Sequence, residues 1–472
     1  MKVFISPIFV VLIYAFLLRI YNLNYNSPFL DEAQYLILGR KVLVGHWQES
    51  NPFAWVGGMP LFYPTLSAVF GFWGITGSRL LNALLGTISV YLLYLIVRYL
   101  KLSNNDQDNE TSAIIAASFL AVLAVPLYLS RLAIYDMLSF TLLLAGLVLL
   151  LKSLKSEKQK DWRKENWYFG AAVFIAASYL AKYISFIIFP VVALAAFWQA
   201  KINGNHEVRL YLKYFLLPLS TIVIGYALWQ YPALIHFQEE QISKATSHSV
   251  VILKSFYSYS LPVLLPAAIG ALLLFFKSSR TALVLIILAL TPLAVHLATN
   301  NSAASGQHSY LTVIFLLPLA SYGLQSFIGR WPRFGNLLLG LLFIATFFYS
   351  YSQLLKLERA WPNTDKAMDF LKTRTSDHEK ILSSQDDVTL LALPNFRDEN
   401  ITGIFDFKYK NLTGSQAYSL ALSENFFDFV LLDDHAHGTI ESTVLNSITF
   451  HYRPIYNEEP FTIYHKSAIA QG

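Results

Sequence analysis

The sequence predicts a polytopic α-helical membrane protein that carries a smaller mixed α/β domain at its C-terminal end. Of its 472 residues, 55% are hydrophobic and only 14% are charged, whereas an ordinary soluble domain has about 25% charged residues. The apolar residues form long uncharged runs, as membrane-spanning helices require. We therefore divide the chain into a transmembrane part, residues 1–353, and a more polar C-terminal part, residues 354–472.

About eleven apolar segments are candidates for transmembrane helices of about 17 to 22 residues each, with bounds placed to within several residues at either end. We expect them at residues 3–20, 80–99, 112–130, 136–151, 167–181, 184–200, 210–229, 258–276, 281–298, 309–328 and 336–353. The first segment follows Lys2, but no small-residue cleavage site comes after it. We therefore interpret it as an uncleaved span rather than as a signal peptide.

The loops between these segments differ in positive charge, and this difference predicts on which side of the membrane each loop lies. One set of loops carries most of the lysines and arginines, in residues 98–101, 152–164, 201–213, 277–280 and 330–333. By the positive-inside rule these loops and the N-terminus are cytoplasmic. The first outer loop, residues 21–79, and the C-terminal part then lie on the extracytoplasmic side. We read the net charge of +5 as a topology signal, so no nucleic-acid partner is expected.

The C-terminal part has the pattern of a soluble α/β domain, and at about 110 residues it can bury a core of its own. The periodicity predicts helices at 365–371 and 415–423, strands at 380–384 and 427–432, and a terminal hairpin of strands at 453–456 and 461–464. The two hairpin strands are separated by a turn that contains Pro460, and this agrees with the preference of proline for turns.

Residues 31–44 of the first outer loop are expected to form an interfacial helix. They carry apolar side chains at helical spacing, but they are too few and too charged to span the membrane. Asp31 and Glu32 lie in the first turn of this helix, where the helix dipole stabilises acids, and a purely structural role is one interpretation. Consecutive helical residues diverge by about 100°, so at most one of the two carboxylates is a base.

Three further charged residues are expected on the same outer side at membrane depth. Arg131 and Asp136 flank the start of the fourth span, and Lys182 lies between the fifth and the sixth. Ionisable groups in such places mark functional sites unless they are otherwise explained. The alternatives are a structural ion pair between Arg131 and Asp136, and a Lys182 that snorkels to the interface.

His308 and Tyr310 begin the span at 309–328 on the outer side, where either could serve as a headgroup anchor or contact a substrate. His46 and Glu49 are spaced for a metal if their segment is helical, but two ligands alone do not define a metal site. The chain has no cysteine, so a thiolate site and a cysteine nucleophile are excluded.

The order of several short motifs resembles the GT-C glycosyltransferases, in the branch of the protein O-mannosyltransferases and the bacterial aminoarabinose transferases of lipid A. The resemblance covers most of the first 200 residues. The motifs are Asp31-Glu32-Ala33-Gln34-Tyr35, Pro60-Leu61-Phe62-Tyr63-Pro64, Ser78-Arg79-Leu80-Leu81-Asn82-Ala83-Leu84-Leu85-Gly86, Ser130-Arg131 followed by Asp136, and Ala181-Lys182-Tyr183.

This resemblance implies an enzyme that transfers a sugar, with inversion, from a polyprenyl-phosphate donor to a lipid, glycan or protein hydroxyl at the outer face of the plasma (inner) membrane. Such a mannosyltransferase-like enzyme would serve the cell envelope. The implied roles are a catalytic base or acceptor-orienting carboxylate at Asp31, a second acidic site at Asp136, donor-phosphate binding by Arg131, Lys182 and Arg79, and substrate contacts by Glu32, Tyr35, His308 and Tyr310.

Two departures from the lipid A branch bear on the cofactor. That branch has an arginine three residues after its catalytic aspartate, where this chain has Gln34, and a Glu-Lys pair where this chain has Gly58 and Met59. Those residues contribute metal and phosphate contacts in that branch. The resemblance therefore gives no firm basis for a divalent metal or for an aminoarabinose donor, and it indicates no other cofactor.

Two alternatives come from other functional classes. The first is a transporter or flippase of a lipid-linked sugar, and the second is a non-catalytic scaffold for envelope assembly. Transporters commonly show internal repeats and helices broken at the midplane, whereas the notable charges of this chain are expected at one face.

Overall fold

The computed structural model describes residues 6–46, 53, 56–155, 162–239, 248–404, 407–433 and 442–467. The chain forms two compact units. The first comprises Met1–Leu23 and Leu38–Leu357, and the second comprises Asn24–Ile37 and Glu358–Gly472. The division falls inside helix α2 (Leu30–Leu43), so the start of this helix belongs to the second unit.

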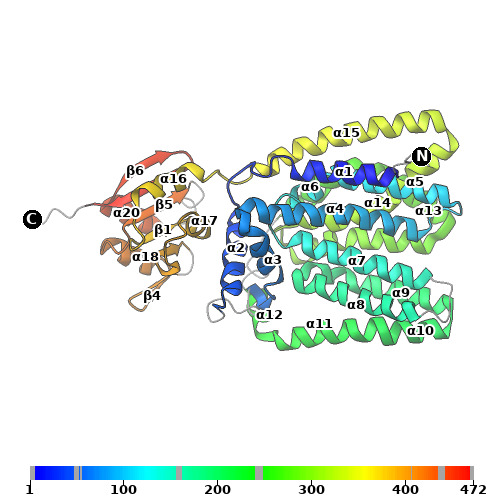
Figure 1. The fold of residues 1–472 in the computed structure, drawn as a ribbon, viewed down its shortest axis with the longest axis horizontal. Helices are drawn as coiled ribbons and strands as arrows, with labels where there is room; N and C mark the ends of the chain where they lie inside the picture. The colour runs from blue at the N-terminus through cyan, green and yellow to red at the C-terminus, as the bar shows by residue number, and fades with distance from the viewer. Residues whose placement is uncertain are drawn as a thin grey trace, which may run out of the picture. The chain divides into compact units, whose positions relative to one another are not determined.

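The first unit is built from helices, most of which run side by side, with the short α3 and α12 at one end of the bundle (Figure 1). Its helices are α1 (Pro7–Ile20), η1 (Val56–Gly58), α3 (Phe62–Phe70), η2 (Gly71–Trp73), α4 (Gly74–Leu100), α5 (Asp106–Val122), α6 (Ala124–Leu129), α7 (Asp136–Lys155), α8 (Trp162–Ala181), η3 (Tyr183–Ile188), α9 (Phe189–Asn203), α10 (Asn205–Tyr211), η4 (Leu212–Leu216), α11 (Leu217–Trp229), α12 (Tyr231–Phe237), α13 (Ser249–Thr299), α14 (Ser305–Arg330) and α15 (Pro332–Glu358).

Among the described residues, 7 helical stretches are long and apolar enough to cross a membrane, and α1 is a shorter apolar helix. The described part of each predicted span is mostly helical, and the span predicted at 112–130 is divided between α5 and α6 by the extended Leu123. The two spans predicted at 258–276 and 281–298 are joined in the 51-residue α13, whose backbone breaks at Ser278 (φ −150°, ψ 79°). A mostly helical membrane fold is thus confirmed, whereas the number of spans and the N-in orientation stay predictions.

Close backbone contact holds α13 and α14 together. A Cβ atom on Gly270 would clash with the carbonyl oxygen of Leu319, and one on Gly323 would clash with the carbonyl oxygen of Pro266. Small residues at such crossings let membrane helices approach closely, and van der Waals packing then stabilises the pair. Helix α14 is accordingly the most buried of the candidate spans, with 78% of its apolar window inside the unit.

The second unit contains a five-stranded sheet with strand order β2-β1-β5-β7-β6, in which β2, β1 and β5 are parallel and the other two pairings are antiparallel. A separate ribbon pairs β3 with β4. The elements are α16 (Asp365–Arg374), β1 (Ile381–Ser383), α17 (Asp386–Ala392), η6 (Asp398–Asn400), β2 (Ile401–Gly403), β3 (Lys408–Tyr409), β4 (Leu412–Thr413), α18 (Gly414–Ser423), β5 (Phe429–Asp433), α20 (Ser442–His451), β6 (Tyr452–Glu458) and β7 (Phe461–Lys466).

Both faces of this sheet are covered. Strand β5 is buried along its whole length, so alternate residues enter opposite apolar clusters: Val430 packs near Leu422 of α18, and Leu431 near Leu371 of α16. Burial on both faces is typical of parallel strands. The segments predicted as helices, strands and the hairpin have those structures here, and α17, η6, β2, β3, β4 and α20 are additional. An extracytoplasmic position for this unit stays a prediction.

The segment 24–29, which we had assigned to the transmembrane part, is bound to residues 358–364 of the second unit. Asn26 Nδ2 donates to the carbonyl oxygens of Glu358 and Trp361, both at 3.1 Å. Trp361 Nε1 donates to Ser27 O (3.1 Å), and the Thr364 amide donates to Ser27 Oγ (2.9 Å). The start of α2 is therefore fixed by residues more than three hundred positions later in the chain.

Candidate active site

A buried ion pair joins the start of α7 to the junction between α8 and η3. The Nζ atom of Lys182 lies 2.5 Å from Oδ1 of Asp136, and the two side chains are only 10% and 2% exposed. The same Nζ lies 3.4 Å from Oε1 of Gln307 and 4.9 Å from the ring centroid of Tyr135. Lys182 therefore does not snorkel, and the close basic partner of Asp136 is Lys182.

The local backbone explains how this pair forms. Asp136 is the first residue of α7, where the helix dipole favours a negative charge. Lys182 has an extended conformation (φ −158°, ψ 124°) between two helices, which turns its side chain out of the α8 helical path. Two opposite charges are tolerated in a buried position only when their mutual attraction and hydrogen bonding offset the cost of removing them from water.

Arg131 and Arg79 both bind the backbone that follows α1. Arg131 Nη2 donates to Tyr21 O (2.7 Å) and Asn22 O (3.0 Å), and Arg79 Nη1 donates to Leu23 O (2.7 Å). Both side chains are almost wholly buried. The two arginine motifs of the sequence are thus brought to one short turn, where they position the chain that leads out of the first helix.

Asn82 ties the same motifs together. Its Nδ2 atom donates to the carbonyl oxygens of Leu132 and Ile134, the latter at 2.7 Å, and so connects α4 to the stretch between Arg131 and Asp136. The Nδ2 group is thus occupied by two carbonyl groups, whereas the buried Oδ1 atom of the same side chain has no hydrogen-bond partner among the described residues. Its place in the Ser78–Gly86 motif therefore has a structural cause.

Arg19 is a buried cation whose importance the sequence analysis missed. It lies in the last turn of α1 with 1% of its surface exposed. Its Nε atom donates to Ser130 Oγ (3.1 Å) and its Nη1 to Ala15 O (2.9 Å) and Ala121 O (3.3 Å). A Cβ atom on Gly86 would clash with Ser130, so this glycine provides the space that the contact needs. A basic residue at the end of an apolar segment is common, so the sequence carried no special signal.

His308 and Tyr310 are buried inside the bundle and do not lie at its surface, as headgroup anchors would. The ring of Tyr310 stacks on Phe140 with a centroid distance of 4.6 Å. His308 Nδ1 lies 2.8 Å from Nε2 of His296, a residue that the sequence analysis overlooked, and His296 Nδ1 lies 2.6 Å from Asn301 O. His308 directly follows Gln307, which contacts Lys182, so the histidine pair lies beside the ion pair.

The remaining predicted site residues lie on α2, in the second unit. Glu32 Oε2 accepts a hydrogen bond from the amide of Phe29, the residue before the helix, at 2.9 Å. This is the return bond of a capping box, and it gives the fully buried Glu32 a structural role. Tyr35 is also buried, whereas Asp31 is partly exposed. That at most one of the two acids is a base stays a prediction.

A metal site is not evident from the side chains alone. Within the part of the chain that the structure describes, no three His, Asp or Glu side chains come close enough to hold an ion. Glu49, which the spacing paired with His46, lies outside the described residues.

Residues 54–240 match the family model of dolichyl-phosphate-mannose-protein mannosyltransferase. ArnT from Cupriavidus metallidurans in the apo state has a TM-score of 0.65 at 11% identity, covering 97% of this chain and 96% of that chain. ArnT bound to undecaprenyl phosphate has a TM-score of 0.62 at 12% identity, covering 98% of both chains. The Archaeoglobus fulgidus oligosaccharyltransferase with Zn and sulfate has a TM-score of 0.59 at 14% identity, covering 98% of this chain and 73% of that chain. No curated protein matches the chain in sequence.

The chain has the GT-C fold. The resemblance to GT-C glycosyltransferases of the mannosyltransferase and aminoarabinose transferase branch is confirmed, as is the prediction of a glycosyltransferase enzyme. The helices and these relatives also confirm an integral membrane protein. Within this GT-C chain, the segment that matches the family model contains Arg79, Arg131, Asp136 and Lys182 but begins after Asp31. The roles of all the predicted site residues therefore stay predictions.

Proposed function

We propose that this chain transfers a sugar from a polyprenyl-phosphate donor to a hydroxyl acceptor at the extracytoplasmic face of the plasma membrane. The observation that carries the proposal is the buried Asp136–Lys182 pair at one end of α7 in a chain with the GT-C fold. The relatives support the donor class, since ArnT was solved with undecaprenyl phosphate and the archaeal AglB with a dolichol-phosphate and an inhibitory peptide. The proposed acceptor is a hydroxyl group of a lipid, a glycan or a protein, and the proposal assigns no particular sugar.

Lys182 is proposed to bind the phosphate of the donor. In the absence of a donor the carboxylate of Asp136 is the counter-ion of Lys182 at this buried position. A phosphate group that enters beside Nζ gains a charge-assisted hydrogen bond. As the sugar leaves, negative charge builds up on the phosphate, and a cation fixed in place stabilises it in the transition state.

Arg131 and Arg79 are proposed to assist Lys182. Each arginine offers a planar set of donors that suits phosphate oxygens, and each already uses part of that set on the carbonyl groups that follow α1. These backbone bonds hold the guanidinium groups at a fixed position. Pre-positioned donors need no rearrangement at the moment of reaction, which is the basis of their contribution.

Asp31 is proposed as the base or the acceptor-orienting carboxylate. It accepts the proton of the acceptor hydroxyl while that oxygen forms a bond to the anomeric carbon. The bond from the anomeric carbon to the phosphate oxygen breaks, and its electron pair leaves with the lipid phosphate. A single displacement of this kind inverts the anomeric centre. Glu32 caps the helix, so the neighbouring Asp31 is the acid assigned to the reaction.

The test uses the full chain in membranes supplied with polyprenyl-phosphate sugars, and measures released polyprenyl phosphate. Removing a general base slows a reaction by about 10²–10⁴-fold, so we expect that loss in Asp31→Asn. Asp136→Asn should lose activity as well. The matched control is Asp365→Asn, which changes an exposed acid in the first turn of α16 and should leave the rate unchanged.

Transfer at the normal rate by both Asp31→Asn and Asp136→Asn, at normal expression, would overturn the proposal. The comparisons do not favour a transporter or flippase. Movement of a labelled lipid-linked sugar across the membrane without release of the lipid phosphate would nevertheless replace the proposed reaction by transport.

A further inference from the structure

An apolar pocket of about 620 Å³ opens between α7, α9, α13 and α14 of the first unit. It lies toward the end of α7 that is opposite Asp136, because Lys155 is both a lining residue and the last residue of this 20-residue helix. The rise of an α-helix separates the two ends by roughly 28 Å. That distance is about the thickness of the hydrocarbon core of a bilayer, so the pocket lies near the other membrane face.

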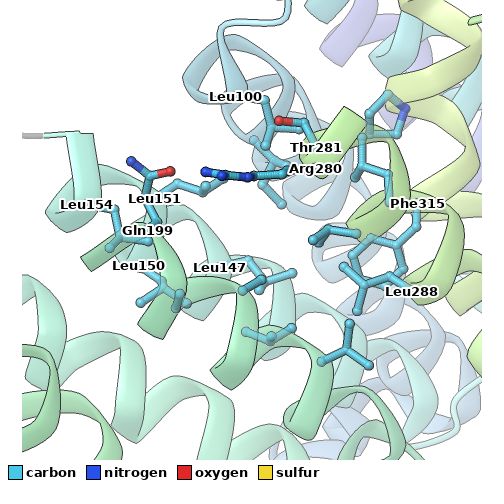
Figure 2. Close-up of a pocket in the computed structure, with 18 of the residues that line it drawn as sticks. Leu100, Leu147, Leu150, Leu151, Leu154, Gln199, Arg280, Thr281, Leu288 and Phe315 are labelled. Carbon is cyan, nitrogen blue, oxygen red and sulfur yellow. The ribbon is translucent and has the colours of Figure 1, made fainter. Parts of the chain in front are cut away.

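The polar side chains of the pocket gather at one of its ends (Figure 2). Arg280 extends across this end toward Gln199, while Leu147, Leu288 and Phe315 lie farther along the pocket. The rest of the lining is almost entirely leucine, isoleucine, valine and alanine. The pocket therefore offers a long apolar space with a cationic mouth.

This mouth lies where the membrane boundary is expected. Helix α13 breaks at Ser278, two residues before Arg280, and Ser278 Oγ lies 2.9 Å from Oγ1 of Thr281 at the start of the next helical stretch. Lys155, the last residue of α7, also lines the pocket. Polar residues at the ends of two helices mark the depth of the lipid headgroups.

Among the residues that the structure describes, no acid is paired with either of the two cations at the mouth. Arg280 lies over the ring of Trp198 at 5.3 Å from its centroid, a contact that leaves the edge of the guanidinium accessible. Neither Arg280 nor Lys155 forms an ion pair with a carboxylate among the residues that the structure describes. By contrast, Lys164 and Lys182 of the same unit are each paired with a buried acid.

We propose that this pocket binds an anionic membrane phospholipid, with one acyl chain in the apolar space and the phosphate headgroup at Lys155 and Arg280. Basic pockets between transmembrane helices recognise anionic headgroups in this way. A zwitterionic lipid is a poorer match, because its ammonium group would be brought to the same cations. The far end of a polyprenyl chain is a poorer match too, because it carries no charge to meet them.

The bound lipid would add contacts between α9 and α13, both of which line the pocket. A ligand that binds only the folded state stabilises it, so the lipid acts as a structural component of the bundle. This inference is independent of the sugar-transfer proposal, since it concerns the other end of the helices and its readout is lipid binding.

The test is native mass spectrometry of the full chain released from nanodiscs that contain equal amounts of phosphatidylglycerol and phosphatidylethanolamine. We expect retained phosphatidylglycerol in the unaltered protein. The double variant Lys155→Gln/Arg280→Gln should bind it roughly 30-fold more weakly, as the loss of two basic contacts to an anionic lipid predicts. The matched control is Lys201→Gln/Arg333→Gln, which removes two exposed cations that do not line the pocket and should bind like the unaltered protein.

Equal retention of the two lipids by the unaltered protein would overturn the inference. Unchanged phosphatidylglycerol binding in the double variant would overturn it as well, and so would its loss in the control. Added polyprenyl phosphate that displaces the phospholipid in proportion to its concentration would assign the pocket to the donor lipid instead. A second variant, Leu147→Trp, fills the apolar space while keeping both cations and should also lose the lipid, which separates binding from any misfolding caused by the charge changes.

Discussion

The helical first unit contains buried ion pairs as well as the exposed pair Arg98–Glu110, at 56% and 34%. In the described part of the α/β second unit, each ion pair has at least one partner that is accessible to water. In the helical unit Lys182–Asp136 and Lys164–Glu207 have side chains no more than 10% exposed. In the α/β unit Lys410–Glu424 is 57% and 36% exposed, and the two core clusters are dominated by apolar side chains. Exposed pairs contribute little to stability, whereas a buried pair carries a large desolvation cost. A pair retained inside the bundle therefore calls for a functional or architectural explanation.

The largest effect is expected where a buried pair is also assigned to the reaction. Lys182→Met leaves Asp136 without its lysine partner and should lower the free energy of unfolding by about 3–5 kcal/mol, with loss of sugar transfer. The double variant Asp136→Asn/Lys182→Met removes both charges, so it should recover most of the stability and none of the transfer. Thermal unfolding in detergent and release of polyprenyl phosphate measure the two properties. A double variant as unstable as the single one would show that the charges do not depend on each other.

The second buried pair tests whether burial alone implies a role in the reaction. Lys164→Met breaks the 2.5 Å contact with Glu207, but Tyr168 also donates to this carboxylate. The loss of stability should therefore be near the lower limit, about 3 kcal/mol. Transfer per folded molecule should be unchanged, because the pair joins α8 to α10 away from the predicted site. A selective loss of transfer, measured at equal amounts of folded protein, would contradict this distinction.

A smaller, pH-dependent effect is expected in the α/β unit. Burial raises the pKa of Asp386 above its ordinary value of 3.8, although backbone amides oppose the shift. The folded state then holds the proton more tightly than the unfolded state, so this carboxyl favours folding below the ordinary pKa and loses that contribution as pH rises through the folded pKa. Asp386→Asn should remove this contribution to the pH dependence of the unit's stability, and it should slightly stabilise the unit near neutral pH.

Hydrogen exchange of β1 and β2 in the full chain, corrected for intrinsic exchange rates, measures this effect. Asp386 is a suitable probe of these strands because its carboxylate covers Gly403 at the end of β2, where a Cβ atom would clash with it. Asp387→Asn is the neighbouring control. An identical pH dependence in the Asp386→Asn variant and the unaltered chain would refute the assignment.

The smallest effect is expected at the exposed pair of the same unit. Lys410 Nζ lies 2.6 Å from both carboxylate oxygens of Glu424, yet both side chains are accessible to water. Lys410→Met should therefore leave the unfolding temperature unchanged within error, and added salt should not alter that result. A drop as large as that caused by Lys164→Met would remove the contrast between the two units.

The sequence predicted the helices of the first unit well because a membrane requires long apolar segments. It also singled out Asp136 and Lys182, since ionisable groups at membrane depth are rare. It could not pair them, because they are 46 positions apart and spacing along the chain does not say which helices are neighbours. His296 was missed for the same reason, since its partner His308 lies on the next helix. The assignment of residues 24–37 to the second unit depends on Trp361, and no local pattern indicates it.

The hydrogen bonds between residues 26–27 and 358–364 also determine the order in which parts of the molecule can form during synthesis. The ribosome makes Trp361 335 positions after Asn26, which at about 5–20 residues per second is a delay of roughly 15–70 s. Until then, the nascent chain lacks the groups that fix the entry to α2. The entry to the helix that carries Asp31 is therefore fixed only after residues 358–364 have been made, which follows the synthesis of the helices of the first unit. A chain that terminates before residue 358 would contain the helices of the first unit but would lack the partners of Asn26 and Ser27, so biosynthesis itself delays the assembly of this part of the molecule.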